Sequence, residues 1–380
     1  MAQYIFYTAG DYKNMRVTGG TKRFREIILY LLQQGDEIFL MAPGNIDFPE
    51  DKNLTIIPVK TFHSKILPNG LLNFLLNIRK FKKISKEEYD TSVMVSIPYG
   101  IQAVLAGLKN ITLIVWEDII DYRMIRYRNE PNQLMYYLKK IVLPIYKKIE
   151  RHTLKSVKRI VVQCNYDKEV LKSRHPMLKS TIDDKASVLF NNVNTSWLTR
   201  YSYLAGKKEK SKDKTKILFV GNINDERKGL HILLEAVAML LEKNVPVSLE
   251  VIGEGKLKDH YKEQYANYKD IRFVGELSNP VPEIAKADMM VVPSQADSFP
   301  NTVLEGLYME IPVLGAKNGG IPEILHYEEL LFDSDPVLLA DKIQDIITNN
   351  RLEQYRELCR KRKDALTFDW LHALKQIITE

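Results

Sequence analysis

The chain has 380 residues, of which 45% are hydrophobic and 27% charged, and this composition excludes disordered, collagen-like and coiled-coil chains. Its length exceeds that of one ordinary domain, so two domains are expected. No window approaches the roughly 18 uncharged apolar residues that a membrane-spanning helix needs, and the N-terminus lacks a signal-peptide pattern. We therefore expect a cytoplasmic protein.

Short apolar runs alternate with helical patterns along the whole chain. The strands expected in the first half are Tyr4–Thr8, Glu37–Met41, Leu54–Val59, Thr91–Ser96, Ile111–Trp116 and Ile160–Gln163. Those expected in the second half are Lys216–Val220, Ser248–Ile252, Ile271–Val274, Met289–Val292 and Pro312–Gly315. Nearly continuous hydrophobic strands that alternate with helices form parallel sheets covered on both faces. The pattern predicts an α/β chain with two doubly wound, Rossmann-like domains.

The boundary between the halves is marked by composition. The asparagine-rich stretch 191–194 is expected to be the hinge, and the lysine-rich run 206–216 a mobile loop, because it has almost nothing to bury. The predicted domains are 1–195 and 196–364. The helical pattern at 365–380 is expected to pack across the junction, or back onto the first domain. Ligands of doubly wound sheets bind at the carboxyl ends of the strands, so the chemistry is sought there.

The net charge of +7 is unevenly distributed along the chain. Eleven Lys and Arg residues stand against two Glu between Tyr122 and Ile160. In the segment 71–86, a leucine-rich stripe precedes a basic run on one expected helix. Such helices favour contact with an anionic membrane surface. The alternative for 71–86 is a solvated helix whose leucines pack on a sheet. Nucleic acid is disfavoured because no known binding motif accompanies the charge.

Neither a disulfide nor a metal site is expected. Cys164 and Cys359 are the only cysteines and lie far apart, which indicates reduced, buried thiols. None of the seven histidines belongs to a pair with metal-ligand spacing. We therefore predict no metal and no cofactor.

The sharpest signal is the stretch from Val292 to Gly306. A buried strand is expected to end at Pro293, and a helix to begin near Asn301 with its free N–H groups available to a phosphate. Glu305 would lie one turn inside this helix, within reach of ribose hydroxyls, and Asp297 would lie in the preceding loop. The alternative is a capping box, with Thr302 as the cap and Glu305 as its partner.

Five motifs follow one another across the second half. They are Ile217–Gly221 with Arg227-Lys228-Gly229, Val251–Gly255, Phe273–Gly275, the acidic-x7-Glu pair of Asp297 and Glu305, and Gly319–Glu323. In this order they resemble the retaining family-4 glycosyltransferases (glycosyl transferases group 1) of the GT-B fold. The resemblance implies two Rossmann-like domains that face a central cleft.

The resemblance also implies roles for individual residues. Lys228 would contact the donor diphosphate, Asp297 the hydroxyls of the donor sugar, and Glu305 the ribose. The base would lie against Phe273, Val274 and Gly275. The candidate catalytic residues are Asp297, Lys228, Arg227 and Glu117; the candidate donor-binding residues are Gly19, Gly20, Asn222, Phe273, Val274, Gly275, Phe299, Asn301, Thr302 and Glu305.

The chain departs from the family pattern at three places. Asn222 stands where a phosphate-binding Arg is common, so either Arg227 supplies that charge or the phosphate contact is weaker. Pro300 removes one N–H group from the expected helix start. A donor-contacting His is often found after the fifth strand, and Glu117 or Asp118 stands there instead.

The implied activity is the transfer of a hexosyl or N-acetylhexosaminyl group from a nucleotide diphosphate sugar, with retention. UDP-sugars are favoured over GDP-sugars, and the acceptor would be a hydroxyl of a glycan or a lipid-linked molecule. The basic helices suggest a protein peripheral on the inner face of the membrane, in the synthesis of capsule, exopolysaccharide or lipopolysaccharide. The alternatives are a GT-B epimerase or phosphorylase, and a non-catalytic partner subunit.

Overall fold

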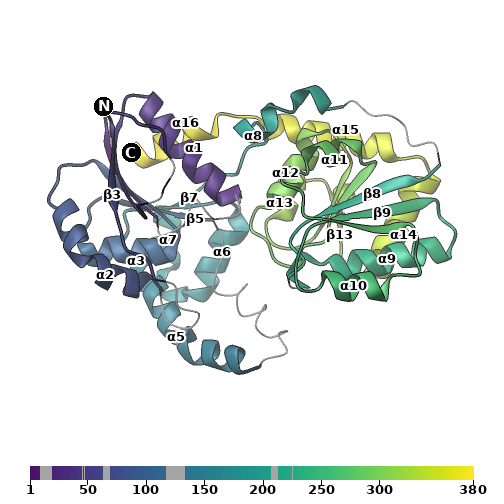
Figure 1. Ribbon diagram of the computed structural model, residues 1–380, viewed down its shortest axis with the longest axis horizontal. Helices are drawn as coiled ribbons and strands as arrows, with labels where there is room; N and C mark the ends of the chain where they lie inside the picture. Colours follow the sequence, from purple (N-terminus) through teal and green to yellow (C-terminus); the bar gives the residue numbers. More distant parts are fainter. Residues whose placement is uncertain are drawn as a thin grey trace. The chain divides into compact units, whose positions relative to one another are not determined.

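The computed structural model describes residues 1–8, 19–44, 46, 48–62, 69–116, 133–206, 213–224 and 226–380 (Figure 1). It contains two compact units. The first comprises Met1–Leu189 together with Asp369–Glu380, and the second comprises Phe190–Phe368.

The first unit is built on a parallel seven-stranded sheet in the order β3-β2-β1-β4-β5-β6-β7. Its strands are β1 (Gln3–Tyr7), β2 (Glu37–Ala42), β3 (Leu54–Pro58), β4 (Thr91–Val95), β5 (Ile111–Val115), β6 (Arg159–Val162) and β7 (Ala186–Val188). Its main helices are α1 (Gly19–Gln33), α2 (Asn69–Ile84), α3 (Ile97–Ala106), α5 (Gln133–Ser156), α6 (Asn165–Arg174) and α7 (Lys179–Lys185). The direction of strand progression reverses between β1 and β4, which defines a doubly wound sheet.

Alternate residues of the central strand β1 enter different cores. Ile5 and Tyr7 belong to the core that also contains Phe81 of α2 and Leu154 of α5. Phe6 instead packs edge-on against Phe24 of α1, with the ring centroids 6.0 Å apart. Successive side chains of a strand point to opposite faces of its sheet. The contacts of Ile5, Phe6 and Tyr7 therefore show that helices cover both faces.

The C-terminal helix α16 (Trp370–Thr379) is part of the first unit. The buried Trp370 ring lies under the guanidinium of Arg23, 4.4 Å from its carbon atom Cζ. Lys375 Nζ pairs with Asp36 at 2.7 Å, and Thr91 Oγ1 donates to the Ile378 carbonyl at 2.9 Å. Aromatic burial and polar contacts therefore fasten this distant segment to α1 and the sheet.

The second unit has a parallel six-stranded sheet in the order β10-β9-β8-β11-β12-β13. Its strands are β8 (Thr215–Val220), β9 (Val247–Ile252), β10 (Ile271–Gly275), β11 (Met289–Val292), β12 (Val313–Ala316) and β13 (Leu331–Phe332). Its helices include α8 (Ser196–Thr199), α9 (Leu230–Glu242), α10 (Lys258–Gln264), α11 (Val281–Lys286), α12 (Asn301–Tyr308), α13 (Ile321–Leu325), α14 (Pro336–Thr348) and α15 (Leu352–Ala365). Figure 1 shows α9, α10 and α14 on one face of the sheet and α11, α12 and α15 on the other.

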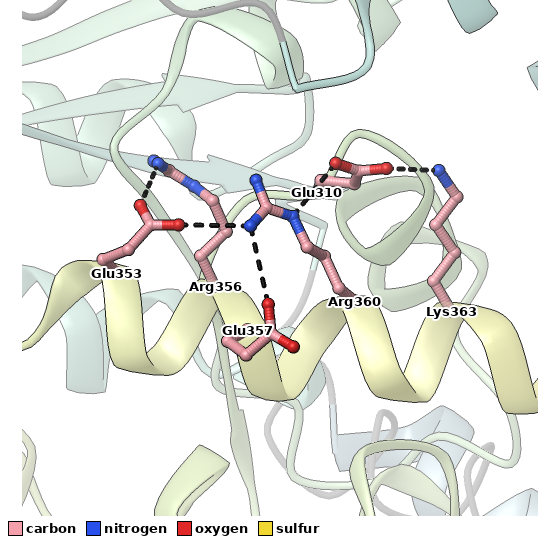
Figure 2. Close-up of polar contacts among 6 residues, drawn as sticks. All are labelled: Glu310, Glu353, Arg356, Glu357, Arg360 and Lys363. Carbon is pink, nitrogen blue, oxygen red and sulfur yellow. Dashed lines mark hydrogen bonds and ion pairs between the residues drawn. The ribbon is translucent and has the colours of Figure 1, made fainter.

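Ion pairs join α15 to the turn that follows α12 (Figure 2). Glu310 accepts from Arg360 Nε at 3.2 Å and from Lys363 Nζ at 2.7 Å. Arg360 also reaches Glu353, which pairs with Arg356. The backbone of Glu310 has φ 58°, a conformation that is unfavourable for a residue with a side chain. The ion pairs to α15 offset this cost.

The structure differs from the sequence-based expectations in several details. The expected strands end within one residue of the observed ones. The sequence does not reveal β7 and β13, because strands of two or three residues are too short to show an alternation of apolar and polar side chains. The predicted boundary is 195/196, whereas the units meet at 189/190. Residues 190–195 belong to the second unit because Val193 N bonds the Leu366 carbonyl and Asn192 bonds that of Phe368. The lysine-rich run lies largely outside the described residues.

Two further expectations concern side chains. Both cysteines are free and buried, as predicted. The alternative in which the leucines of 71–86 pack on the sheet is wrong for Leu75 and Leu76, which are 64% and 51% exposed. Asn73 and Asn77 face inward instead, because they bond the backbone of the segment that follows β3.

Candidate functional site

Two loops of the second unit meet where its strand order reverses. One follows β8 and contains Arg227 and Lys228, and the other follows β11 and contains Asp297. β8 and β11 are neighbours in the sheet, paired through Met289 and Ile217. Parallel doubly wound sheets bind their ligands at such a reversal, outside the carboxyl ends of the strands. The fold thus brings together residues that are 69 apart in the sequence.

Four contacts join the two loops. Lys228 Nζ donates to Asp297 Oδ2. Arg227 Nη1 donates to the Ala296 carbonyl at 3.2 Å and lies 4.0 Å from the same Asp297 oxygen. The amide of Gln295 donates to the Arg227 carbonyl at 2.7 Å. Two cations thereby converge on one carboxylate, and about a fifth of each side chain stays exposed: 22% for Lys228, 23% for Arg227 and 16% for Asp297.

Glycines allow the backbones to approach this closely. A Cβ atom at Gly229 would lie 1.8 Å from the Pro293 carbonyl oxygen, and one at Gly319 would lie 2.0 Å from that of Asp297. Both residues have positive φ, 69° and 60°. The amide of Gly320 donates to the same Asp297 carbonyl at 3.0 Å. Gly229 and Gly319 therefore contact the backbone of this loop at two points, and neither position has room for a side chain.

Arg362 supports this arrangement from α15. Its Nε donates to the Ile324 carbonyl at 2.5 Å and its Nη2 to the Glu323 carbonyl at 3.0 Å. These carbonyls lie near the end of α13, which begins just after Gly320. Burial lowers the pKa of Arg362, although the guanidinium stays charged at neutral pH. Sequence reasoning missed this contact because no local pattern links α15 to α13.

The helix α12 begins directly after the second loop. Its N-cap is Pro300, with Asn301 and Thr302 as its first two residues, and Glu305 lies one turn further on. The capping-box alternative is wrong, because Thr302 is inside the helix and Pro300 occupies the cap position. Phe299 is buried and stacks on Phe190 at 5.6 Å between ring centroids. Phe299 therefore contributes to the packing just before α12.

The other predicted donor-binding residues lie at neighbouring strand ends. Asn222 follows β8, and its Oδ1 accepts from the amide of Asn224 at 2.8 Å, so this side chain closes a local turn. Phe273, Val274 and Gly275 end the edge strand β10. The amide of Gly253 donates to the Gly275 carbonyl at 2.9 Å, which joins the ends of β9 and β10.

In the first unit, Gly19 and Gly20 are the first residues of α1. Glu117 and Asp118 lie outside the described residues. One residue that the sequence did not single out is Ser96, which follows β4 with φ 94° and precedes α3. Its amide donates to the Ile114 carbonyl at 2.8 Å, so the pairing with β5 continues through this unusual conformation.

Two absences concern metals and membranes. In the described ranges, no group of three or more His, Cys, Asp or Glu side chains is arranged to hold a metal ion. In the same part of the chain, no helix has both the length and the apolar character needed to cross a bilayer.

Sequence comparisons connect the chain to known proteins. Residues 214–349 match the family model of glycosyl transferases group 1. The chain is 29% identical over 201 residues to an uncharacterized glycosyltransferase of Methanocaldococcus jannaschii, covering 50% of this chain and 52% of that protein. It is 25% identical to a phosphatidyl-myo-inositol mannosyltransferase of Mycobacterium leprae, covering 50% and 51%. It is 27% identical to the O-antigen biosynthesis glycosyltransferase WbnH of Escherichia coli, covering 37% and 40%. The chain spans about half the length of the curated relatives it matches first.

Solved structures match both units. Sucrose-phosphate synthase of Thermosynechococcus elongatus has a TM-score of 0.74 at 15% identity, covering 99% of this chain and 98% of that one. The lipopolysaccharide glycosyltransferase WaaG has a TM-score of 0.68 at 16% identity, covering 99% of both chains. HepE of Anabaena, solved with UDP and glucose, has a TM-score of 0.66 at 14% identity, covering 99% and 98%. These likenesses confirm the predicted fold class, in which two Rossmann-like sheets form the GT-B fold.

Proposed function

We propose that the chain transfers a sugar from a nucleotide diphosphate sugar to an acceptor hydroxyl, and the proposal starts from the match of residues 214–349 to the family model of glycosyl transferases group 1. The observation that carries the proposal is the convergence of Lys228 and Arg227 on Asp297 at the strand-order reversal. Cations and a carboxylate placed together match a donor that has anionic phosphates on one side and sugar hydroxyls on the other.

The proposed donor site uses the groups around this cluster. Lys228 and Arg227 neutralise the diphosphate, and the start of α12 adds the N–H groups of Asn301 and Thr302. Glu305 accepts hydrogen bonds from the ribose, and Asp297 from the sugar. Without a donor, Asp297 holds Lys228 at the site, so the lysine is already oriented when the diphosphate arrives. UDP is the favoured nucleotide, since HepE was solved with UDP and glucose.

In the proposed reaction, the bond between the anomeric carbon and the β-phosphate oxygen breaks while a bond to the acceptor oxygen forms on the same face of the sugar. The leaving phosphate keeps the electron pair and takes the acceptor's proton, so no enzymic nucleophile is required. The charge that develops on the diphosphate is stabilised by Lys228 and Arg227, which do the work that a divalent cation does elsewhere. Retention is proposed only because the spacing of Asp297 and Glu305 resembles that of the retaining family.

The proposed acceptor is a hydroxyl of a glycan or a lipid-linked molecule, in the assembly of a cell-surface polysaccharide. The O-antigen and phosphatidyl-inositol relatives support this class of acceptor. Hexosyl and N-acetylhexosaminyl donors are both compatible with the proposal.

A thermal-shift panel of UDP, GDP, ADP and CMP compounds, with and without EDTA, tests the donor site. A ligand that binds only the folded state raises its stability in proportion to affinity. We expect stabilisation by one nucleotide series, unchanged by EDTA and lost in Lys228→Ala. Stabilisation by none of them in a folded sample would contradict the proposal and favour the non-catalytic partner. Turnover of the bound sugar nucleotide without any acceptor would instead indicate an epimerase or phosphorylase.

A further inference from the structure

The helix α2 has an unusual distribution of side chains. Asn73 and Asn77 face the interior, where Asn77 bonds both the amide and the carbonyl of Lys60, at 2.9 and 2.7 Å. Leu75 and Leu76 point away from the core. The inward asparagines therefore leave two adjacent leucines on the surface of the unit, where they are available to a partner.

The same layer of helices carries more exposed apolar groups. α3 packs against both α2 and α5, so the three helices form one layer of the first unit (Figure 1). The exposed apolar side chains of this layer include Leu75, Leu76, Leu105, Tyr137, Ile141 and Ile145. Tyr137, Ile141 and Ile145 are spaced by four residues and form one stripe along α5. These six side chains are called the outer helical face below.

The same helices carry exposed cations. The exposed basic residues on α2 and α5 include Arg79, Lys82, Lys83, Lys140, Lys147 and Lys148. The sequence of α2 contains no acidic residue, and that of α5 contains only Glu150. Glu150 is buried, where it accepts from Arg174 Nη1 at 2.8 and 2.9 Å and lies 2.7 Å from His175 Nε2. Its charge is therefore neutralised internally, and the surface of the layer is positive.

We propose that the outer helical face binds an anionic lipid bilayer. Leucine and isoleucine side chains enter the boundary between headgroups and acyl chains, while the lysines beside them contact lipid phosphates. A second copy of this chain fits less well, because a symmetric interface would place the lysines of one copy against those of the other. Nucleic acid also fits less well, because its phosphates leave the exposed leucines unburied.

The proposal predicts binding of the whole chain to vesicles. It is independent of the proposed sugar transfer, since no substrate is present in the measurement. In a flotation assay, we expect the chain to bind phosphatidylcholine vesicles that contain phosphatidylglycerol, and to bind pure phosphatidylcholine at least about tenfold more weakly. Added salt weakens binding to the anionic vesicles.

Two double variants separate the apolar and electrostatic contributions. Leu75→Ser with Leu76→Ser, and Lys82→Glu with Lys83→Glu, are each expected to weaken binding by roughly tenfold or more. Matched controls in the second unit are Leu338→Ser, at an exposed position on α14, and Lys269→Glu. The controls should bind as the unchanged chain does, and circular dichroism should show the same melting temperature for all variants.

Three results would overturn the proposal. The first is absence of vesicle binding, or equal binding to neutral and anionic vesicles. The second is loss of binding in the charge variant only, with the leucine variant unaffected, which points to a polyanion such as nucleic acid. The third is a dimer in light scattering that the leucine variant dissociates, with no vesicle binding by either form, which identifies a second copy as the occupant.

Discussion

Lys228 Nζ donates a hydrogen bond to Oδ2 of Asp297 across two loops that follow β8 and β11. The bond connects a cation and a carboxylate that are 69 residues apart, at the edge where the strand order of the second unit reverses. Arg227 lies 4.0 Å from the same oxygen. This group is the centre of the proposed donor site, and its members can be tested separately.

Replacement of Lys228 by alanine is expected to lower the rate of transfer by roughly 100-fold or more, because the charge of the leaving diphosphate loses a preorganised cation. The melting temperature should change little, since the side chain is partly exposed and its pair with Asp297 is worth little in water. Steady-state kinetics with the donor found in the thermal-shift panel is the measurement. Lys243→Ala, which removes an exposed lysine of the same unit, is the control. Full activity of Lys228→Ala would remove this residue from the site.

Glu305→Ala is expected to weaken binding of the donor nucleotide by roughly tenfold to 100-fold, the usual value of hydrogen bonds to a charged group. Isothermal titration with the nucleoside diphosphate measures this directly. If Glu305 contacts the ribose, the unchanged chain should bind the 2′-deoxy nucleotide more weakly than the parent nucleotide, whereas Glu305→Ala should bind the two almost equally. A variant that still distinguishes the two nucleotides as strongly as the unchanged chain would place Glu305 away from the ribose.

Gly319→Ala is expected to destabilise the second unit by roughly 3 kcal/mol and to lower activity, because the new methyl group would overlap the Asp297 carbonyl. Gly107→Ala is the matched control, with a positive φ of 72° and no atom within 4 Å of the place that its new methyl group would take. The control should lose only about 1 kcal/mol, the cost of the backbone conformation. Urea unfolding compares the two. Equal losses would show that the contact with Asp297 is unimportant.

Glu310→Gln tests the ion pairs that hold α15. Burial alone would raise the pKa of Glu310, but the hydrogen bonds and charges of Lys363 and Arg360 outweigh it and lower the pKa. A lowered folded-state pKa means that the carboxylate contributes stability above its unfolded pKa, and that this contribution is lost as the pH falls through the folded value. We expect the variant to be less stable by about 1 kcal/mol near neutral pH and equal to the unchanged chain in acid.

The control for this prediction is Glu353→Gln, since Glu353 belongs to the same network (Figure 2) but its side chain is 65% exposed. Its effect should be smaller at every pH. A difference between Glu310→Gln and the unchanged chain that persisted in acid would contradict the electrostatic explanation.

Neither cysteine should react in the folded protein. Burial raises the pKa of Cys359 to about 12, and its Sγ accepts a hydrogen bond from the Val313 amide at 3.3 Å. Cys164 is also buried. Titration with an aromatic disulfide at pH about 8 should therefore detect no thiol until denaturant is added, and then two. Rapid labelling of either thiol before unfolding would show that its surroundings open easily.

The identities of the strands and of the main motifs were determined by the sequence itself. A near-continuous apolar run such as 289–292 is typical of a strand buried on both faces of a parallel sheet, and its alternation with helices along the chain predicts a doubly wound order. The short strands β7 and β13 were not predicted. They have no sequence pattern of their own and are strands only because they pair with β6 and β12. The glycines of the motifs, such as Gly229 and Gly319, could be recognised in the sequence. The carbonyl groups that approach them, and that leave no room for a side chain, could not.

The tertiary structure decided which side chains meet. No sequence pattern places Arg227 beside Ala296, or Arg362 on the carbonyls of α13, because these contacts depend on loops brought together by strand pairing. It also decided which face of α2 is buried. Periodicity alone favours leucines inside, yet the backbone of Lys60 and Phe62 needs partners, and Asn73 and Asn77 satisfy it. An unsatisfied buried amide costs more than an exposed leucine, so hydrogen bonding determined the orientation of this helix.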